Sequence, residues 1–125
     1  MNRSPLGSAL GLGSAKEGVG HWVKQRFTGI ALIPLVLYII FAVACFPEVS
    51  YATALSFVAH PFNAIILIAL SIAGFTHAAL GLQMVIEDYI SGHMAKFALL
   101  VLVKLASLLG IIASVFAVIK IALSV

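Results

Sequence analysis

The sequence predicts an all-α integral membrane protein, a bundle of three transmembrane helices with an irregular N-terminal cytoplasmic arm. Of its 125 residues, 63% are hydrophobic and only 9% are charged, and the mean hydropathy of +1.22 is too high for an ordinary soluble domain. The apolar residues also form three runs, each matching the roughly 20 residues that cross hydrocarbon as a helix. These runs are residues 27–46, 62–86 and 97–125, and with an arm over 1–26 they make a single domain, 1–125.

The arm is rich in glycine and serine, in the stretch SPLGSALGLGSAKEGVG, so we expect an irregular path there rather than a helix. Trp22 then stands close to Lys24 and Arg26, as expected of an interfacial anchor at the start of a membrane helix. Pro34 lies inside the first run, where it removes one backbone donor and is expected to kink the helix.

The charges predict the topology. The arm holds four basic residues and the second loop holds Lys96, whereas the loop 47–61 contains Glu48 and no Lys or Arg. The positive-inside rule therefore puts the N-terminus in the cytoplasm and the C-terminus in the periplasm. The arm has neither the apolar core of a signal peptide nor the arginines of a transit peptide, which favours a bacterial inner-membrane protein. Because the basic residues are scattered beside apolar runs, we expect contact with the lipid bilayer and none with nucleic acid.

Cysteine usage limits the metal chemistry. Cys45 is the only cysteine, so this chain alone forms no disulfide, no CxxCH haem attachment and no cysteine-based iron–sulfur or zinc site. Any metal must then be held mainly by histidine.

His77 is the leading candidate for a functional residue. The second run carries no other ionisable side chain, and an imidazole near the middle of a membrane span needs a partner. On an ideal helix Gly74 and Gly81 share its face, so a flat, bulky group could approach there. Alternatively, these glycines form with Ser71 and Ala78 a small-residue seam for helix packing, with the imidazole hydrogen-bonded across the interface.

As a metal ligand, His77 fits haem better than zinc. No second histidine lies three or four residues away on the same helix, which argues against a mononuclear zinc site. A porphyrin supplies four ligands itself, so one axial histidine from this chain suffices. The second axial ligand would come from a partner subunit.

Asp88 and Tyr89 form a candidate polar site at the membrane surface. Asp88 follows His77 by eleven residues, about three helical turns, and so returns to nearly the same face about 16 Å nearer the surface. A tyrosine hydroxyl beside a carboxylate can donate a hydrogen bond to a carbonyl oxygen and help to relay a proton, as quinone reduction requires. The alternatives are an aromatic-belt residue for Tyr89 and a solvated helix-end charge for Asp88.

These motifs, HWVKQR before the first run, GFTHAALGLQ in the second and EDY at its end, resemble those of a known family. It is the small hydrophobic membrane anchor of succinate dehydrogenase, the cytochrome b moiety of respiratory complex II. The similarity covers almost the whole chain, including GLGSAKEGV ahead of the tryptophan and arginine. Each motif is weak alone, but their ordered combination is specific.

The resemblance implies roles residue by residue. His77 matches an axial ligand of haem b, Tyr89 a residue of the ubiquinone site, and Asp88 its supporting neighbour. Arg26 matches an arginine near the haem propionates and the quinone region, in a supporting role. No residue of this chain is implied as catalytic in succinate oxidation itself.

The resemblance also implies partners and a pathway. They are a larger cytochrome b anchor subunit that supplies the other haem ligand, an iron–sulfur subunit and a flavoprotein subunit. The chain would be a non-flavin subunit of succinate:quinone oxidoreductase, inactive alone, in the tricarboxylic acid cycle and aerobic electron transport. The main alternative is a structural three-helix membrane protein or assembly partner without a cofactor. A proton-linked transporter would use His77 and Asp88 as a relay, but three helices without an inverted repeat are a poor scaffold for one.

Overall fold

A computed structural model describes residues 12–124, which form four helices and no strand. Helix α2 spans Leu12–Ala44, α3 Tyr51–Ala59, α4 Pro61–Tyr89 and α5 His93–Leu123. In the described part of the chain, three stretches are long and apolar enough to cross a membrane, namely Val19–Ala44, Pro61–Tyr89 and His93–Leu123. The prediction of an all-α protein with three membrane helices is confirmed.

The predicted irregular arm is wrong from Leu12 onward, because α2 already begins there and runs without interruption into the first apolar span. The helix also continues through Pro34, whose missing donor affects one hydrogen bond of a long helix. Helix α2 ends just ahead of Pro47, where Phe46 N donates to Val43 O at 3.1 Å and so tightens the final turn. Residues 1–11 of the predicted arm lie outside the described residues.

Helix α3 was not predicted, since the segment 47–61 was expected to be a loop. Ser50 caps this helix, because its Oγ accepts a hydrogen bond from Thr53 N at 3.2 Å. His60 then separates α3 from α4: its backbone is extended, as expected for a residue before proline, and Pro61 occupies the first turn of α4. The chain therefore places a nine-residue helix where the hydropathy indicates only a connection.

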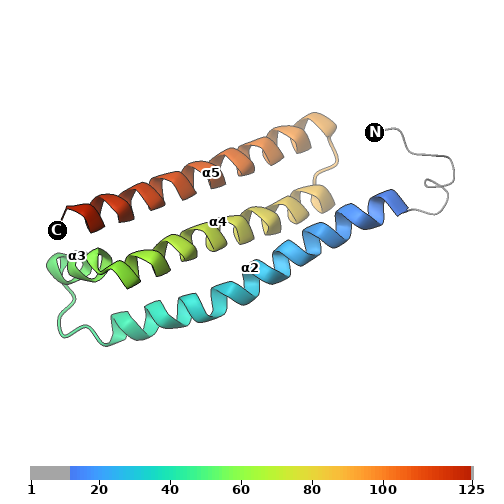
Figure 1. Ribbon diagram of the computed structural model, residues 1–125. Coiled ribbons are helices and arrows are strands. Elements are labelled where there is room, and N and C mark those ends of the chain that lie inside the picture. The colour runs from blue at the N-terminus through green and yellow to red at the C-terminus, as the bar shows by residue number, and fades with distance from the viewer. Residues whose placement is uncertain (1–11, 125) are drawn as a thin grey trace.

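The membrane helices form a row with α4 in the middle (Figure 1). Helix α4 contacts α2 along one side and α5 along the other, and α3 packs against α4 and α5. Within residues 12–124, α2 and α5 are not in contact. Because successive membrane helices run in opposite directions, one end of the bundle holds the start of α2, the end of α4 and the start of α5 (Figure 1).

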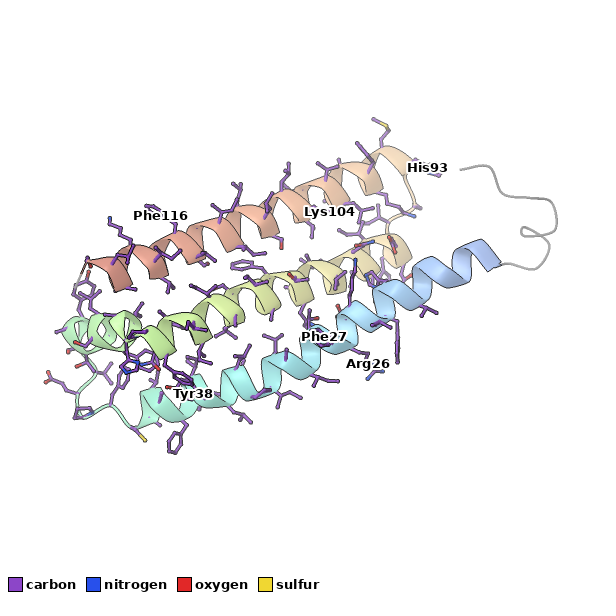
Figure 2. All side chains as sticks on the ribbon, in the orientation of Figure 1. Arg26, Phe27, Tyr38, His93, Lys104 and Phe116 are labelled. Carbon is purple, nitrogen blue, oxygen red and sulfur yellow. The ribbon has the colours of Figure 1, made fainter. Side chains whose placement is uncertain are left out.

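Almost no side chain is removed from solvent by the chain itself. Among the described residues only Asn63, Ala64 and Ile86 are buried. Large apolar side chains instead face outward along the spans, including Phe27 on α2 and Phe116 on α5, which are 72% and 66% exposed (Figure 2). Surfaces of this kind are stable only when lipid or partner helices cover them.

Two different seams hold α4 between its neighbours. Toward α5, the ring of Phe75 occupies the space in which Gly110 would carry a side chain, and Ser107 Oγ donates to Phe75 O at 3.1 Å. Toward α2, the far end of the interface is joined by a hydrogen bond from the Tyr38 hydroxyl to Asn63 Oδ1. Small residues and interhelical hydrogen bonds are the usual means by which membrane helices associate.

Candidate functional site

A cavity of about 900 Å³ lies between α2 and α4, near the C-terminal end of α4. Its volume falls at the upper end of the range for small-molecule and cofactor sites, about 300 to 1,000 Å³. Apolar side chains such as Ile30, Ile33 and Met84 form part of its wall. The polar side chains that line it are His21, Gln25 and Arg26 from α2 and His77, Gln83, Glu87 and Asp88 from α4.

Helical spacing explains how the sequence builds this wall. On α2, His21, Gln25 and Gly29 follow one another at intervals of four residues and therefore share a face. On α4, Asp88 follows His77 by eleven residues, and both line the same cavity. The prediction that these two side chains share a face is confirmed.

His77 is half-buried and contacts α2 directly. Its Nδ1 lies 3.1 Å from Thr28 Oγ1. A Cβ placed on Gly29 would lie 3.2 Å from the imidazole Cε1 and 3.7 Å from Nδ1, so the ring rests against the backbone of α2 where no side chain intervenes. The absence of a side chain at Gly29 is therefore what admits the imidazole at this point.

Two polar atoms near the cavity lack a partner within the described residues. His21 Nε2 and Gln25 Oε1 are both buried, and neither makes a hydrogen bond. Leaving a buried polar atom unsatisfied costs about 1 to 3 kcal/mol, so each of these atoms favours a hydrogen bond from outside the described residues, either to water or to another molecule. The Gln25 amide also lies 3.6 Å from the position of a Cβ on Gly81, which brings it against α4.

Charged groups of both signs meet in this cavity. The Arg26 guanidinium stands over the Trp22 ring, 5.4 Å from its centroid, in a cation–π arrangement. Figure 2 shows Arg26 beside Phe27 on α2. On α4, Gln83 Nε2 donates to Glu87 Oε1 at 3.0 Å and so orients that carboxylate. The cavity can thus receive both anionic groups and hydrogen-bond donors.

Within residues 12–124, no three His, Cys, Asp or Glu side chains are grouped so as to hold a metal ion. A metal held at His77 would therefore need ligands from outside this group of residues, as haem iron has from its porphyrin.

Comparison with known proteins matches residues 1–119 to the model of the succinate dehydrogenase/fumarate reductase transmembrane subunit family. The chain belongs to this family. It is 36% identical over 116 residues to the succinate dehydrogenase hydrophobic membrane anchor subunit of Rickettsia bellii, covering 93% of each chain. The corresponding subunit of Paracoccus denitrificans is 32% identical over 97 residues, which are 78% of this chain and 75% of that one. A succinate dehydrogenase membrane anchor subunit of Reclinomonas americana is 31% identical over 96 residues, 74% of this chain and 80% of that one.

Family membership and three apolar helices make the chain a multi-pass membrane protein. Of the residues predicted for the site, His77, Asp88 and Arg26 line one cavity. Tyr89 does not line it: the side chain is 81% exposed at the end of α4. Three of the four predicted residues therefore lie around one cavity, and the fourth lies outside it.

Other lining residues were missed. Glu87 and His21 were not among the predicted site residues, yet both line the cavity. Gln25 was not considered. The available signal was the four-residue interval from His21 through Gln25 to Gly29, which becomes visible only if the arm is accepted as helix.

Proposed function

We propose that this chain is the small membrane anchor of a succinate:quinone oxidoreductase, which binds haem b jointly with a larger anchor subunit and contributes to ubiquinone reduction. The enzyme would serve the tricarboxylic acid cycle and aerobic electron transport, and succinate would be oxidised in other subunits, so this chain is inactive alone. The observation that carries the proposal is the cavity that His77 lines together with His21 and Gln25 of α2, each of which has a buried polar atom without a partner among the described residues.

The residues present fit haem b. His77 would be one ligand of the haem iron, and the larger anchor would supply the other, since the porphyrin itself provides four. Arg26, and the unsatisfied His21 Nε2 when it carries a proton, can donate to the anionic propionates, whereas Gln25 Oε1 can only accept a hydrogen bond. When bound, haem supplies a one-electron redox centre whose potential depends on its ligands and their hydrogen bonds.

Asp88 and Tyr89 are proposed to serve the quinone. The Tyr89 hydroxyl would donate a hydrogen bond to a quinone carbonyl, and Asp88 would relay a proton from water toward it. Because Tyr89 is largely exposed outside the cavity, its quinone contact requires a pocket completed by the iron–sulfur subunit and the larger anchor. The site would therefore form only in the complex.

The same proposal gives the chain an orientation. The end of the bundle that carries Arg26 and Asp88 would face the cytoplasm, where the iron–sulfur and flavoprotein subunits dock. The N-terminus would be cytoplasmic and the C-terminus periplasmic, in the inner membrane of a bacterium. The segment 45–60 at the opposite end contains no Lys or Arg, which agrees with this orientation, whereas Lys120 in the last turn of α5 opposes it.

The haem role is tested on the complex purified through a tag on this chain, with its subunits identified and a dithionite-reduced minus oxidised spectrum recorded. His77→Ala should remove or strongly weaken the b-type signal. His93→Ala is the matched control, because His93 is exposed at the start of α5 and does not line the cavity (Figure 2). A normal b-type spectrum in His77→Ala would refute the ligand role.

The quinone role has its own experiment. Tyr89→Phe should slow ubiquinone reduction while succinate oxidation by an artificial soluble acceptor continues. Tyr51→Phe is a suitable control, since Tyr51 is also 81% exposed but lies at the start of α3, at the opposite end of the bundle. Unchanged ubiquinone kinetics in Tyr89→Phe would remove this residue from the site.

A structural protein without a cofactor is the second candidate, and one observation favours it. His77 hydrogen-bonds to Thr28 across a seam with Gly29 on one side and Gly74 and Gly81 on the other. Helix packing alone would use such a contact. This candidate predicts a purified assembly with no haem spectrum and no flavoprotein partner.

A further inference from the structure

The Thr28 hydroxyl is placed among three polar atoms at once. Its Oγ1 lies 2.8 Å from Lys24 O, 3.1 Å from Gln25 O and 3.1 Å from His77 Nδ1. The first two are carbonyl oxygens of its own helix, which can only accept a hydrogen bond. The third belongs to α4 and can donate or accept, depending on the tautomer of the imidazole.

Counting protons decides between the tautomers. A threonine hydroxyl has one proton to donate. If that proton pointed to His77 Nδ1, Oγ1 would stand 2.8 Å from the Lys24 carbonyl oxygen and 3.1 Å from that of Gln25 with no hydrogen between them, which is repulsive. The hydroxyl therefore donates back to its own helix, as helical threonines commonly do.

It follows that Nδ1 carries the proton of the neutral imidazole and donates it to Thr28 Oγ1. A neutral imidazole has only one N–H, so Nε2 of His77 keeps a free lone pair. That nitrogen is then available to a metal. The opposite tautomer, with Nε2 protonated, could not ligate iron through that atom.

We propose that Thr28 is a positioning residue, which holds His77 in the tautomer and ring orientation that present Nε2 to haem iron. The proposal rests on the haem-binding role proposed above for His77. Residues that accept the second ring N–H of a ligating histidine fix its orientation and raise its basicity, and their loss costs about 10- to 100-fold in metal affinity. Gly29 contributes the space, because the ring edge that includes Nδ1 lies against it.

The test compares Thr28→Val, which removes the hydroxyl at nearly constant volume, with Thr28→Ser, which keeps it. Thr76→Val is the matched control, since Thr76 lies beside His77 on α4 and its replacement leaves the Thr28 hydroxyl in place. In the purified complex we would measure the rate of haem transfer to excess apomyoglobin and the midpoint potential of the haem.

Thr28→Val should lose haem about 10- to 100-fold faster than the wild type. Its midpoint potential should shift upward, because a less basic ligand stabilises ferric iron less. Thr28→Ser and Thr76→Val should both resemble the wild type. A merely structural role for Thr28 would not raise the potential, and rescue by serine separates the hydroxyl from the packing of the methyl group.

Wild-type haem retention and potential in Thr28→Val would overturn the proposal. The outcome stays distinct from that of the proposed function, which His77→Ala tests. If His77→Ala loses the b-type signal and Thr28→Val does not differ from the wild type, only the positioning role fails. If His77→Ala keeps the signal, the ligand role fails, and the positioning role fails with it.

Discussion

Replacing Gly29 with alanine should damage the site without weakening the helix that carries it. The new Cβ would lie 3.2 Å from His77 Cε1, whereas non-bonded carbons prefer about 3.5 to 4.0 Å. The imidazole must therefore withdraw by about 0.3 Å or more. A matching withdrawal would lengthen the 3.1 Å contact between Thr28 Oγ1 and His77 Nδ1 to about 3.4 Å, beyond the usual range for a hydrogen bond.

The helix itself should gain from the same change. Alanine is favoured over glycine in a helix interior by about 1 kcal/mol. Gly20→Ala on α2 is the matched control, because nothing lies within 4 Å of its Cβ position and only the propensity changes. Both variants should therefore assemble, and Gly20→Ala should unfold thermally no earlier than the wild type.

The two variants should differ in haem. Removing a group that orients a metal ligand lowers metal affinity about 10- to 100-fold. We therefore expect Gly29→Ala to release haem to apomyoglobin at least about 10-fold faster than Gly20→Ala. The assay is the transfer rate together with the reduced-minus-oxidised spectrum of each purified complex. Equal haem retention in the two variants would show that the contact at Gly29 does not position His77, and the reasoning would be wrong.

Three further predictions concern packing. Gly110→Ala should lower the thermal stability of the assembly, because its Cβ would overlap the Phe75 ring and overpacking costs about 1 to 3 kcal/mol; stability equal to the wild type would show that the ring moves freely. Tyr38→Phe should destabilise the other end of the interface by about 1 to 3 kcal/mol, since buried Asn63 loses its donor, and denaturant unfolding would measure it. Ser50→Ala should cost α3 about 0.5 to 2 kcal/mol of capping, seen as faster amide exchange within α3 alone; exchange that rises equally in α4 would contradict a local role.

Hydropathy was sufficient to predict the membrane helices and insufficient to find α3. A span is specified by a long run of apolar residues, because the bilayer requires every backbone group to be bonded within its own segment. Helix α3 has only nine residues and cannot cross the membrane, so its signals were local: Ser50 as the cap and Pro61 as the start of the next helix. The early start of α2 was missed for another reason. The glycines of the N-terminal segment were taken to exclude a helix, yet the helical conformation extends back to Leu12.

The candidate site likewise contains residues that the sequence could predict and residues that it could not. His77 and Asp88 could be placed on one face from their spacing alone, because an α-helix repeats every 3.6 residues. His21 and Gln25 could not be identified in this way. Their place in the site depends on facing α4 and on having a buried polar atom that no described residue hydrogen-bonds. Tyr89 shows the converse: its predicted site extends beyond the cavity of this chain, so the sequence motif indicates a role that only an assembled complex can complete.

By itself, the sequence determined that the chain crosses the membrane three times and that His77 is the one ionisable group inside the second span, because both depend on composition along a single helix. Only the tertiary structure decided that α4 stands between α2 and α5, and that His77 meets Thr28 and Gly29 of α2. The physical reason is that lipid is as apolar as the helix surfaces, so hydropathy does not select which face meets which neighbour. That choice is made by small residues and interhelical hydrogen bonds, whose partners are separated along the chain.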